Sequence, residues 1–339
     1  MSTSNFLRLL CAVGAAQVLA SEIPMQVERL PDNPIISPAL SDSIGENING
    51  PSVIRVPDWV ESPLGRYYLY FSHHKGKFIR LAYADELAGP WKIHEPGALD
   101  LADSGFPTAI DKADLDPAWR ARLEATGRPV DDFLYAHIAS PEAVVVPDAG
   151  EIRLYYHGML PNGTQMSRVA VSRNGLDFEA LPDIIARSYL RVFHHDGWYY
   201  GLAMPGVIYR SRDGLTDWQE GPTLFDTNMR HAALLQDGDR LQVFWTRVGD
   251  TPEHIKRSII DLAGDWMNWQ ESEAVEVLRP ELDWEGATLP LEPSVRGAIE
   301  RPVNQLRDPE IFVDESGTYL LYSVAGESGI GIARIAEAQ

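Results

Sequence analysis

Cysteine is almost absent from this chain: Cys11 is the only one among its 339 residues. A disulfide framework is therefore excluded, and the stability of the fold must come from the size of its apolar core. A hydrophobic fraction of 45% is sufficient for such a core. Cys11 itself lies in a segment that we expect to be removed, so the mature protein would have no thiol.

Long hydrophobic runs are equally scarce. Beyond the N-terminus, no stretch approaches the ~20 apolar residues that a membrane span needs. Residues 1–20 combine Arg8 with an apolar run that ends at Ala20, a pattern typical of a secretory signal peptide. We therefore predict cleavage before Ser21, a secreted or periplasmic location, and a single domain over residues 21–339. The alternative is an N-terminal extension that is not cleaved.

Positive charge is also in short supply. The chain has 29 Lys and Arg against 49 Asp and Glu, a formal net charge of −20. This balance argues against a nucleic-acid partner, which would need a basic face, and against docking on an anionic membrane. The sequence indicates no oligomeric state.

Motifs for metals, nucleotides and serine catalysis are missing as well. The sequence has no cysteine ligand pair, His-Glu-x-x-His motif or EF-hand loop, so no metal or other cofactor is expected. It also lacks a P-loop and a Gly-x-Ser-x-Gly elbow, which removes the nucleotide-binding and serine-hydrolase classes.

The chain does contain a repeat. Residues 307–323 open with Asp-Pro, continue as an apolar strand, turn at Asp-x-x-Gly and return as an aromatic strand, which predicts a hairpin. Four earlier stretches follow the same order and add a third strand of small and β-branched residues. We place the five copies at residues 49–92, 139–180, 188–219, 229–270 and 306–336.

Repetition of this kind predicts an all-β fold, a five-bladed β-propeller, because four-stranded units repeated around an axis define that architecture. A two-sheet sandwich would explain the strands without explaining their recurring order. We further expect residues 33–38 to supply an outer strand that closes the ring against the last blade.

Two segments exceed the repeat. Residues 95–135 include helix-start chemistry at Asp116-Pro117, and residues 271–305 are rich in Glu and Pro. Long loops in a compact domain are usually binding walls or lids.

Superposition of the copies gathers polar residues at one mouth of the channel. The first residues of the innermost strands are Gly50, Ser140, Tyr189, His231 and Asp308. Two residues further on, facing the same side of each strand, are Ser52, Glu142, Arg191, Ala233 and Glu310. The return strands bring His74, His157 and Arg247 to the same mouth. Acids, bases and hydrogen-bonding rings that converge on a concave site suit sugar chemistry.

Several short runs resemble those of the five-bladed propeller glycoside hydrolases, the group of families 32, 43, 62, 117 and 130. They are Arg-Asp-Pro-Glu-Ile-Phe at 307–312, Gly-Pro-Ser-Val-Ile-Arg at 50–55, Tyr-Leu-Tyr-Phe at 68–71 and Gly-Pro-Trp at 89–91. The resemblance implies a general-base Asp at the start of an innermost strand and a general-acid Glu from another blade. Asp308 matches the base by its motif, and Glu142 is the candidate acid.

The resemblance has departures. In family 43 the base usually opens the first blade, where this chain has Gly50, so no single family is assigned. Family 117 can use a His as acid, which keeps His157 and His231 as alternatives. Some of these propellers carry a channel calcium ion, for which this sequence shows no ligand pattern.

We therefore predict an inverting glycoside hydrolase, whose two carboxyl groups stand roughly 6.5–9.5 Å apart. Opposite blades can provide that gap, so Asp308 is paired with Glu142, while Glu310 tunes the acid or binds a hydroxyl group. The predicted substrate-binding residues are His74, His157, Tyr189, Arg191, Arg230, His231, Trp245 and Arg247.

Three other functions remain open. A carbohydrate-binding propeller would have lost the acid–base pair, and a lyase would hold a uronic acid on Arg191, Arg230 and Arg247. A phosphorylase would use the same arginines for phosphate. Structural roles are the simpler alternative for each residue: Asp308 as a turn cap, the arginines as inter-blade ion pairs, and Glu327 as a turn residue.

Overall fold

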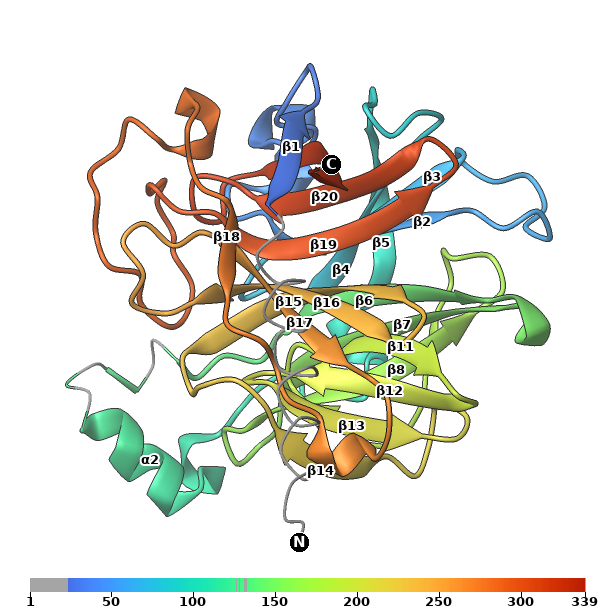
Figure 1. Cartoon of the computed structure of the whole chain (residues 1–339). Helices are drawn as coiled ribbons and strands as arrows, with labels where there is room; N and C mark the ends of the chain where they lie inside the picture. Colours follow the sequence, from blue (N-terminus) through green and yellow to red (C-terminus); the bar gives the residue numbers. More distant parts are fainter. Residues whose placement is uncertain (1–23, 126, 128, 131–132, 339) are drawn as a thin grey trace, which may run out of the picture.

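The computed structural model describes residues 24–125, 127, 129–130 and 133–338, so the predicted signal peptide lies outside the described residues. Five antiparallel sheets form five blades around an axis (Figure 1). The predicted five-bladed β-propeller is therefore confirmed. No helix in the described part of the chain is long and apolar enough to cross a membrane.

Each blade is a sheet that runs outward from an inner strand. Blade one contains β2 (Asn49–Arg55), β3 (Tyr67–Ser72), β4 (Phe78–Ala84) and β5 (Lys92–Asp100). Blade two contains β6 (Ile138–Val146), β7 (Glu151–Met159), β8 (Gln165–Ser172) and two short outer strands, β9 (Glu179–Ala180) and β10 (Ala186–Arg187). Blade three contains β11 (Arg191–His195), β12 (Trp198–Ala203), β13 (Val207–Ser211) and β14 (Gln219–Thr223).

The remaining two blades complete the ring. Blade four contains β15 (Met229–Asp237), β16 (Arg240–Arg247), β17 (Ile255–Asp261) and β18 (Val275–Leu278). Blade five contains β19 (Arg307–Asp314), β20 (Gly317–Ser323), β21 (Ile330–Glu337) and, outermost, β1 (Met25–Arg29). The inner strands contact one another in ring order, and β19 meets β2.

The ring is closed by the N-terminal strand, but not by the residues that we predicted. Strand β1 pairs with β21, with Met25 opposite Glu337, and lies beside the last blade in Figure 1. The predicted strand at residues 33–38 is wrong: that stretch forms a single bridge, between Ile36 and Ile330. Pro34 and Pro38 have no backbone N–H to donate to a ladder. The Asn33 side chain bonds both the N–H and the carbonyl of Ile332 instead.

Five clusters of buried apolar side chains fill the interfaces between neighbouring blades. The alternation of a β-strand explains them, because successive side chains point to opposite faces of the sheet. In β3, Tyr68 and Tyr70 pack toward blade two, while Leu69 and Phe71 pack toward blade five. Each inner or middle strand therefore contributes to two cores, and its sequence is apolar throughout rather than alternating.

Helix α2 (Pro117–Glu124) stands outside the ring of blades, at one edge of the molecule in Figure 1. Its start was predicted correctly: the Asp116 side chain accepts a hydrogen bond from the Trp119 N–H, and Pro117 occupies the first turn. The short 3-10 helices are η1 (Pro38–Leu40), η2 (Asp42–Ile44), η3 (Leu101–Asp103), η4 (Lys112–Asp114), η6 (Pro147–Ala149), η7 (Trp266–Asn268) and η8 (Asp283–Glu285).

Candidate active site

The inner strands begin with an irregular backbone that turns residues toward the channel mouth. In blades one, two and five a register shift separates the first pair of the ladder from the next. The residues inside the shift have positive φ: Gly50 (61°), Ser140 (49°) and Asp308 (43°), joined in blade three by Tyr189 (59°). Non-glycine residues rarely adopt this conformation, so its recurrence at equivalent positions supports the predicted superposition of these four copies.

Blade four departs from the predicted superposition by one residue. Its register shift lies between Met229 and Ala232, so Arg230, and not His231, corresponds to Asp308. The other three shifted blades have a proline after the positive-φ residue, and blade four has none. Because blade four lacks this proline, the superposition based on the sequence placed His231 where Arg230 belongs, an error of one position.

Asp308 lies at the start of β19 and is 3% exposed. Its Oδ1 is 3.1 Å from Nδ1 of His231, and its Oδ2 accepts a hydrogen bond from Ser323 Oγ at 3.1 Å. Burial raises the pKa of the Asp308 carboxyl to about 6, with a further contribution from the charge of Glu327. Arg230 Nε donates to Nε2 of His231 at 3.3 Å, and the Asp308 N–H lies 3.3 Å from Nδ1; in the tautomer with the proton on Nδ1, that nitrogen donates to the Asp308 carboxylate.

A row of aromatic rings crosses the mouth of the channel and ends at this pair. Ring centroids are 4.7 Å apart for Tyr135 and His137, 5.5 Å for His137 and His157, 4.5 Å for His157 and Tyr189, and 4.9 Å for Tyr189 and His231. Burial holds the pKa of His157 and of His231 well below the usual value, so both rings are neutral at pH 7. The Nδ1 atom of His157 is buried with no hydrogen-bond partner among the described residues.

Glu142, Glu310 and Arg191 form a second layer, two strand positions below the mouth. Arg191 Nη1 donates to Glu142 Oε2 at 2.7 Å, and its Nε donates to the Ala232 carbonyl at 2.8 Å. Glu310 accepts a hydrogen bond from Ser52 Oγ at 3.3 Å. Burial raises the pKa of both carboxyls, and the charge of Glu142 raises that of Glu310 further.

Glu327 is a central residue that the sequence interpretation left as a turn. It is 1% exposed; Oε1 accepts from Arg307 at 2.8 Å and lies 3.4 Å from His74 Nδ1, while Oε2 accepts from Asn47 at 2.8 Å. These partners lower the pKa of the Glu327 carboxyl although burial opposes them. The surrounding Gly-Glu-Ser-Gly sequence gave no indication of this, because the partners lie up to 280 positions away.

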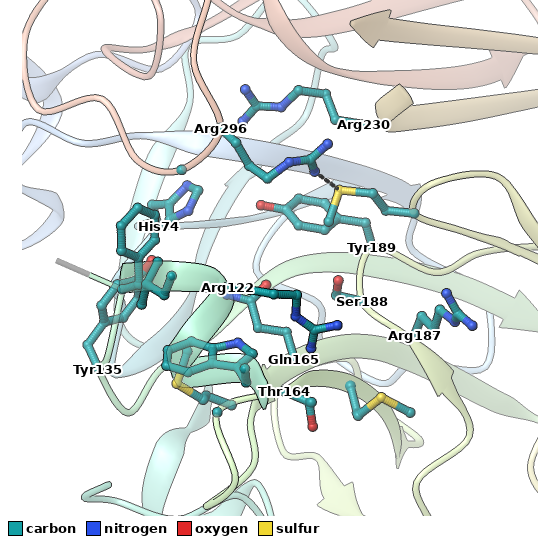
Figure 2. Close-up of a pocket in the computed structure, with 18 of the residues that line it drawn as sticks. His74, Arg122, Tyr135, Thr164, Gln165, Arg187, Ser188, Tyr189, Arg230 and Arg296 are labelled. Atoms are coloured by element: carbon teal, nitrogen blue, oxygen red, sulfur yellow. Dashed lines mark hydrogen bonds between the residues drawn. The ribbon is translucent and has the colours of Figure 1, made fainter. Parts of the chain in front are cut away.

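A pocket of about 770 Å³ opens at the same mouth. Four of the predicted site residues line it: His74, Tyr189, Arg230 and His231. Figure 2 shows Tyr189 with its hydroxyl directed to the side of the pocket where His74 lies, and Arg230 and Arg296 together along the top of the view. Other lining residues come from the segments outside the repeat, namely Trp119, Arg122, Leu123, Phe133, Tyr135, Arg296 and Gly297.

The other predicted site residues do not line the pocket. Asp308 and His157 lie directly behind it, and Glu142, Glu310 and Arg191 lie in the layer below. Arg247 is at the surface, where it pairs with Asp226 at 2.9 Å. Trp245 is 6% exposed, packs against Phe225 and donates to Ser258, so its ring faces the core between blades three and four.

No group of three or more His, Cys, Asp or Glu side chains within the described ranges is arranged to hold a metal ion. The carboxylates at the channel already accept hydrogen bonds from Arg, Asn and Ser.

Fold and site together define the class of protein: a five-bladed β-propeller with a pocket at one mouth of its channel that is lined by apolar, aromatic and arginine side chains. Solved structures with this fold include a putative glycoside hydrolase from Parabacteroides distasonis (TM-score 0.60, 11% identity, 92% of this chain and 97% of that one). Another is a glycosyl hydrolase from Bacteroides ovatus (0.60, 13%, 92% and 95%). A third is the GH43_1 enzyme from Xanthomonas citri complexed with xylotriose (0.55, 14%, 87% and 88%).

At sequence level, no protein-family model matches the chain. It is 36% identical over 338 residues to the uncharacterized protein R118 of Acanthamoeba polyphaga mimivirus, an alignment that covers 91% of this chain and 90% of that protein. The chain belongs to the same family as this viral protein.

Proposed function

We propose that this protein is a secreted glycoside hydrolase that cleaves a glycosidic bond of an oligosaccharide or polysaccharide bound in the pocket, with inversion at the anomeric carbon. The observation that carries the proposal is the Asp308–His231 pair at the pocket floor, with the pKa of Asp308 raised to about 6. Support also comes from structural neighbours that are described as glycoside hydrolases, including the xylotriose complex.

In the proposed reaction, Asp308 and His231 act as one proton-accepting unit. His231 lines the pocket, and Asp308 holds its Nδ1 from behind. As the oxygen of a water molecule bonds to the anomeric carbon, Nε2 of His231 gives up its hydrogen bond from Arg230 and takes the water proton, and the Asp308 carboxylate stabilises the imidazolium that forms. The glycosidic carbon–oxygen bond breaks, and the leaving oxygen receives a proton from the acid.

Glu142 is the proposed acid, since burial raises its pKa and so helps the carboxyl to retain a proton. For this role the glycosidic oxygen must reach the layer below Tyr189, where Arg191 binds Glu142. Glu310 lies in the same layer, where the charge of Glu142 raises its pKa, so the two carboxyl groups compete for a proton.

The first test is a screen of plant and marine glycans with the wild-type protein and the Asp308→Asn variant. We expect the wild type to release sugars and the variant to lose roughly 10²- to 10⁴-fold in kcat/KM while remaining folded. NMR of the first-formed product would establish inversion.

Other outcomes would replace the proposal. Unsaturated products that absorb in the ultraviolet would indicate a lyase, and sugar phosphates formed only with added phosphate would indicate a phosphorylase. Glycan binding without turnover in either protein would indicate a carbohydrate-binding propeller.

A further inference from the structure

The pocket carries charge of one sign, opposite to that of the whole protein. Among the described residues its lining includes four arginines and no Asp or Glu: Arg122, Arg187, Arg230 and Arg296. The chain as a whole has a formal net charge of −20. Concentration of cationic side chains in a cleft focuses a positive potential there and attracts anions from solution.

Two of these arginines lie side by side on one wall (Figure 2). Arg230 is 3% exposed, and its Nη1 donates to the Val295 carbonyl at 3.2 Å and lies 3.4 Å from Glu253. Arg296 Nη2 donates to the Thr227 carbonyl at 2.8 Å. Burial and the charge of Arg230 both lower the pKa of Arg296, because the two guanidinium groups lie close together on this wall, where both can face one anion.

A third arginine faces them from a different part of the chain. Arg122 belongs to helix α2 and extends toward the middle of the pocket in Figure 2. Its side chain is exposed, and the structure gives it no ion pair with any residue that it describes. Arg187, in contrast, is at the rim and pairs with Glu220 at 3.3 Å. Planar guanidinium forks bind carboxylate and similar oxyanions through paired hydrogen bonds.

Aromatic side chains in the same pocket provide surfaces that can bind a sugar ring. Trp119, Phe133, Tyr135 and Tyr189 line the same pocket, and their faces can pack on the apolar face of a pyranose ring. Gln165, Thr164 and Ser188 add neutral hydrogen-bonding groups. The lining therefore combines surfaces for a sugar ring with donors for an anionic substituent.

We propose that the ligand of this pocket is an acidic glycan, whose carboxylate or sulfate group is bound by Arg122, Arg230 and Arg296. This inference rests on the proposed function only in taking the ligand to be a carbohydrate. It goes further in assigning the charge of the substrate, and it assigns binding roles to Arg122 and Arg296, which lie outside the repeat.

The test compares matched ligands. Uronic acid oligosaccharides are measured against the same oligosaccharides after carboxyl reduction, and sulfated oligosaccharides against desulfated ones, by calorimetry at two salt concentrations. We expect the charged member of at least one pair to bind about tenfold or more tightly, with an affinity that falls as salt rises. Which pair shows the difference identifies carboxylate or sulfate as the anion.

Variants locate the effect. Arg122→Gln and Arg296→Gln should each weaken binding of the charged ligand about 10- to 100-fold and leave the neutral ligand unaffected. Arg173→Gln is the matched control, because it removes one positive charge from an exposed side chain outside the pocket. Arg296→Lys keeps the charge without the fork and should recover only part of the affinity. Thermal melting checks that each variant is folded.

The outcomes separate this inference from the proposed hydrolase. Equal binding of charged and neutral glycans would overturn the inference, even if both were hydrolysed. Binding of the acidic glycan without cleavage would support the inference and contradict the hydrolase. Cleavage that requires free phosphate would overturn it too, because the arginines would then hold inorganic phosphate.

Discussion

Two buried carboxyl groups at the channel respond to their surroundings in opposite directions. Asp308 has its pKa raised to about 6, chiefly by burial. Glu327 has its pKa lowered, because His74, Arg307 and Asn47 contribute more than burial does. The difference lies in the partners: Glu327 accepts from a guanidinium and an amide, whereas Asp308 faces a neutral imidazole and a hydroxyl group.

Opposite pKa shifts predict opposite pH dependences of stability. A raised pKa contributes stability that is present below the unfolded value of 3.8 and is lost as pH rises through about 6. In Asp308→Asn that loss, on the order of 3 kcal/mol, should disappear from the pH profile of the unfolding free energy. Glu327→Gln should be destabilised at pH 7, and the deficit should shrink as pH falls below the unfolded value of 4.5. Urea titrations from pH 2 to 8 measure both, and stability differences that change in the same direction with pH in the two variants would contradict the assignment.

The role of Glu142 can be separated from its structural contact with Arg191. If Glu142 donates the proton, Glu142→Gln should slow cleavage of natural glycans by about 10²- to 10⁴-fold. It should spare nitrophenyl glycosides, whose leaving group needs no protonation. Glu310→Gln is the control from the same layer and should affect both substrates alike. Equal losses on both substrates in Glu142→Gln would assign Glu142 to structure alone.

At the residue level, the sequence predicted the positions of those residues that recur at equivalent places in the repeat. Asp308, Tyr189 and Glu142 were found because each occupies a fixed position relative to a strand and a turn. Glu327 and Arg296 belong to a turn and a loop that are not part of the repeat. No local sequence pattern indicates that distant partners bury Glu327 or that Arg296 lines a pocket. Arg247 and Trp245 were placed by strand position alone, which does not determine the direction of a side chain near a strand end.

Among the elements, the closing strand β1 depends on a buried ion pair. Arg29 Nε donates to Glu285 Oε1 at 2.7 Å and its Nη2 to Oε2 at 3.0 Å, and Tyr322 donates to Oε1 at 2.9 Å. The Glu285 side chain is fully buried. This contact links β1, the outer strand of blade five, to the turn at η8. That turn lies within the long segment between blades four and five.

Removal of the charge on Glu285 should therefore weaken the ring. We expect Glu285→Gln to lower the unfolding free energy by about 3 kcal/mol, because it leaves Arg29, in a mostly buried site, with only the exposed Glu281 as a charged partner. The matched control is Glu315→Gln, which removes an exposed pair with Arg55 and should cost less than about 1 kcal/mol. Chemical denaturation compares the two, and similar small losses would show that β1 does not depend on this pair.

Outer strands were also the elements that the sequence predicted least well. Strands β14 and β18 consist largely of exposed or half-exposed residues and carry little apolar alternation. Blade one extends to Asp100 and blade four to Leu278, beyond the predicted ends of their repeats. Inner and middle strands were found because both of their faces are buried between blades.

For the whole molecule, the propeller fold could be predicted from the repeat, whereas the walls of the pocket could not. Five similar hairpins are sufficient to specify a ring of blades, and the segments between them do not change that architecture. The pocket walls come from helix α2 and from residues 296–297, segments that occur once and carry no repeated pattern. The sequence therefore predicted the channel mouth and Arg230, but not Arg122, Arg187 or Arg296, which also line the pocket.

Processing of the N-terminus is a prediction for the whole chain. If residues 1–20 are a signal peptide, the exported protein should begin at Ser21 and contain no thiol, since Cys11 is the only cysteine. Intact mass spectrometry before and after iodoacetamide should show the shorter mass and no alkylation. The uncleaved chain, made without export, is the control and should react once. A full-length mass for the exported protein would contradict the prediction.

Closure of the ring by β1 has a consequence for the timing of folding. Strand β1 precedes the other strands of the described residues, and its partner β21 follows them all, with Met25 paired to Glu337. Blades one to four can assemble in the order in which the ribosome delivers them, but the fifth cannot be completed until β21 has left the ribosome. Until then β1 has no partner, so the ring closes only after all five blades have been synthesised.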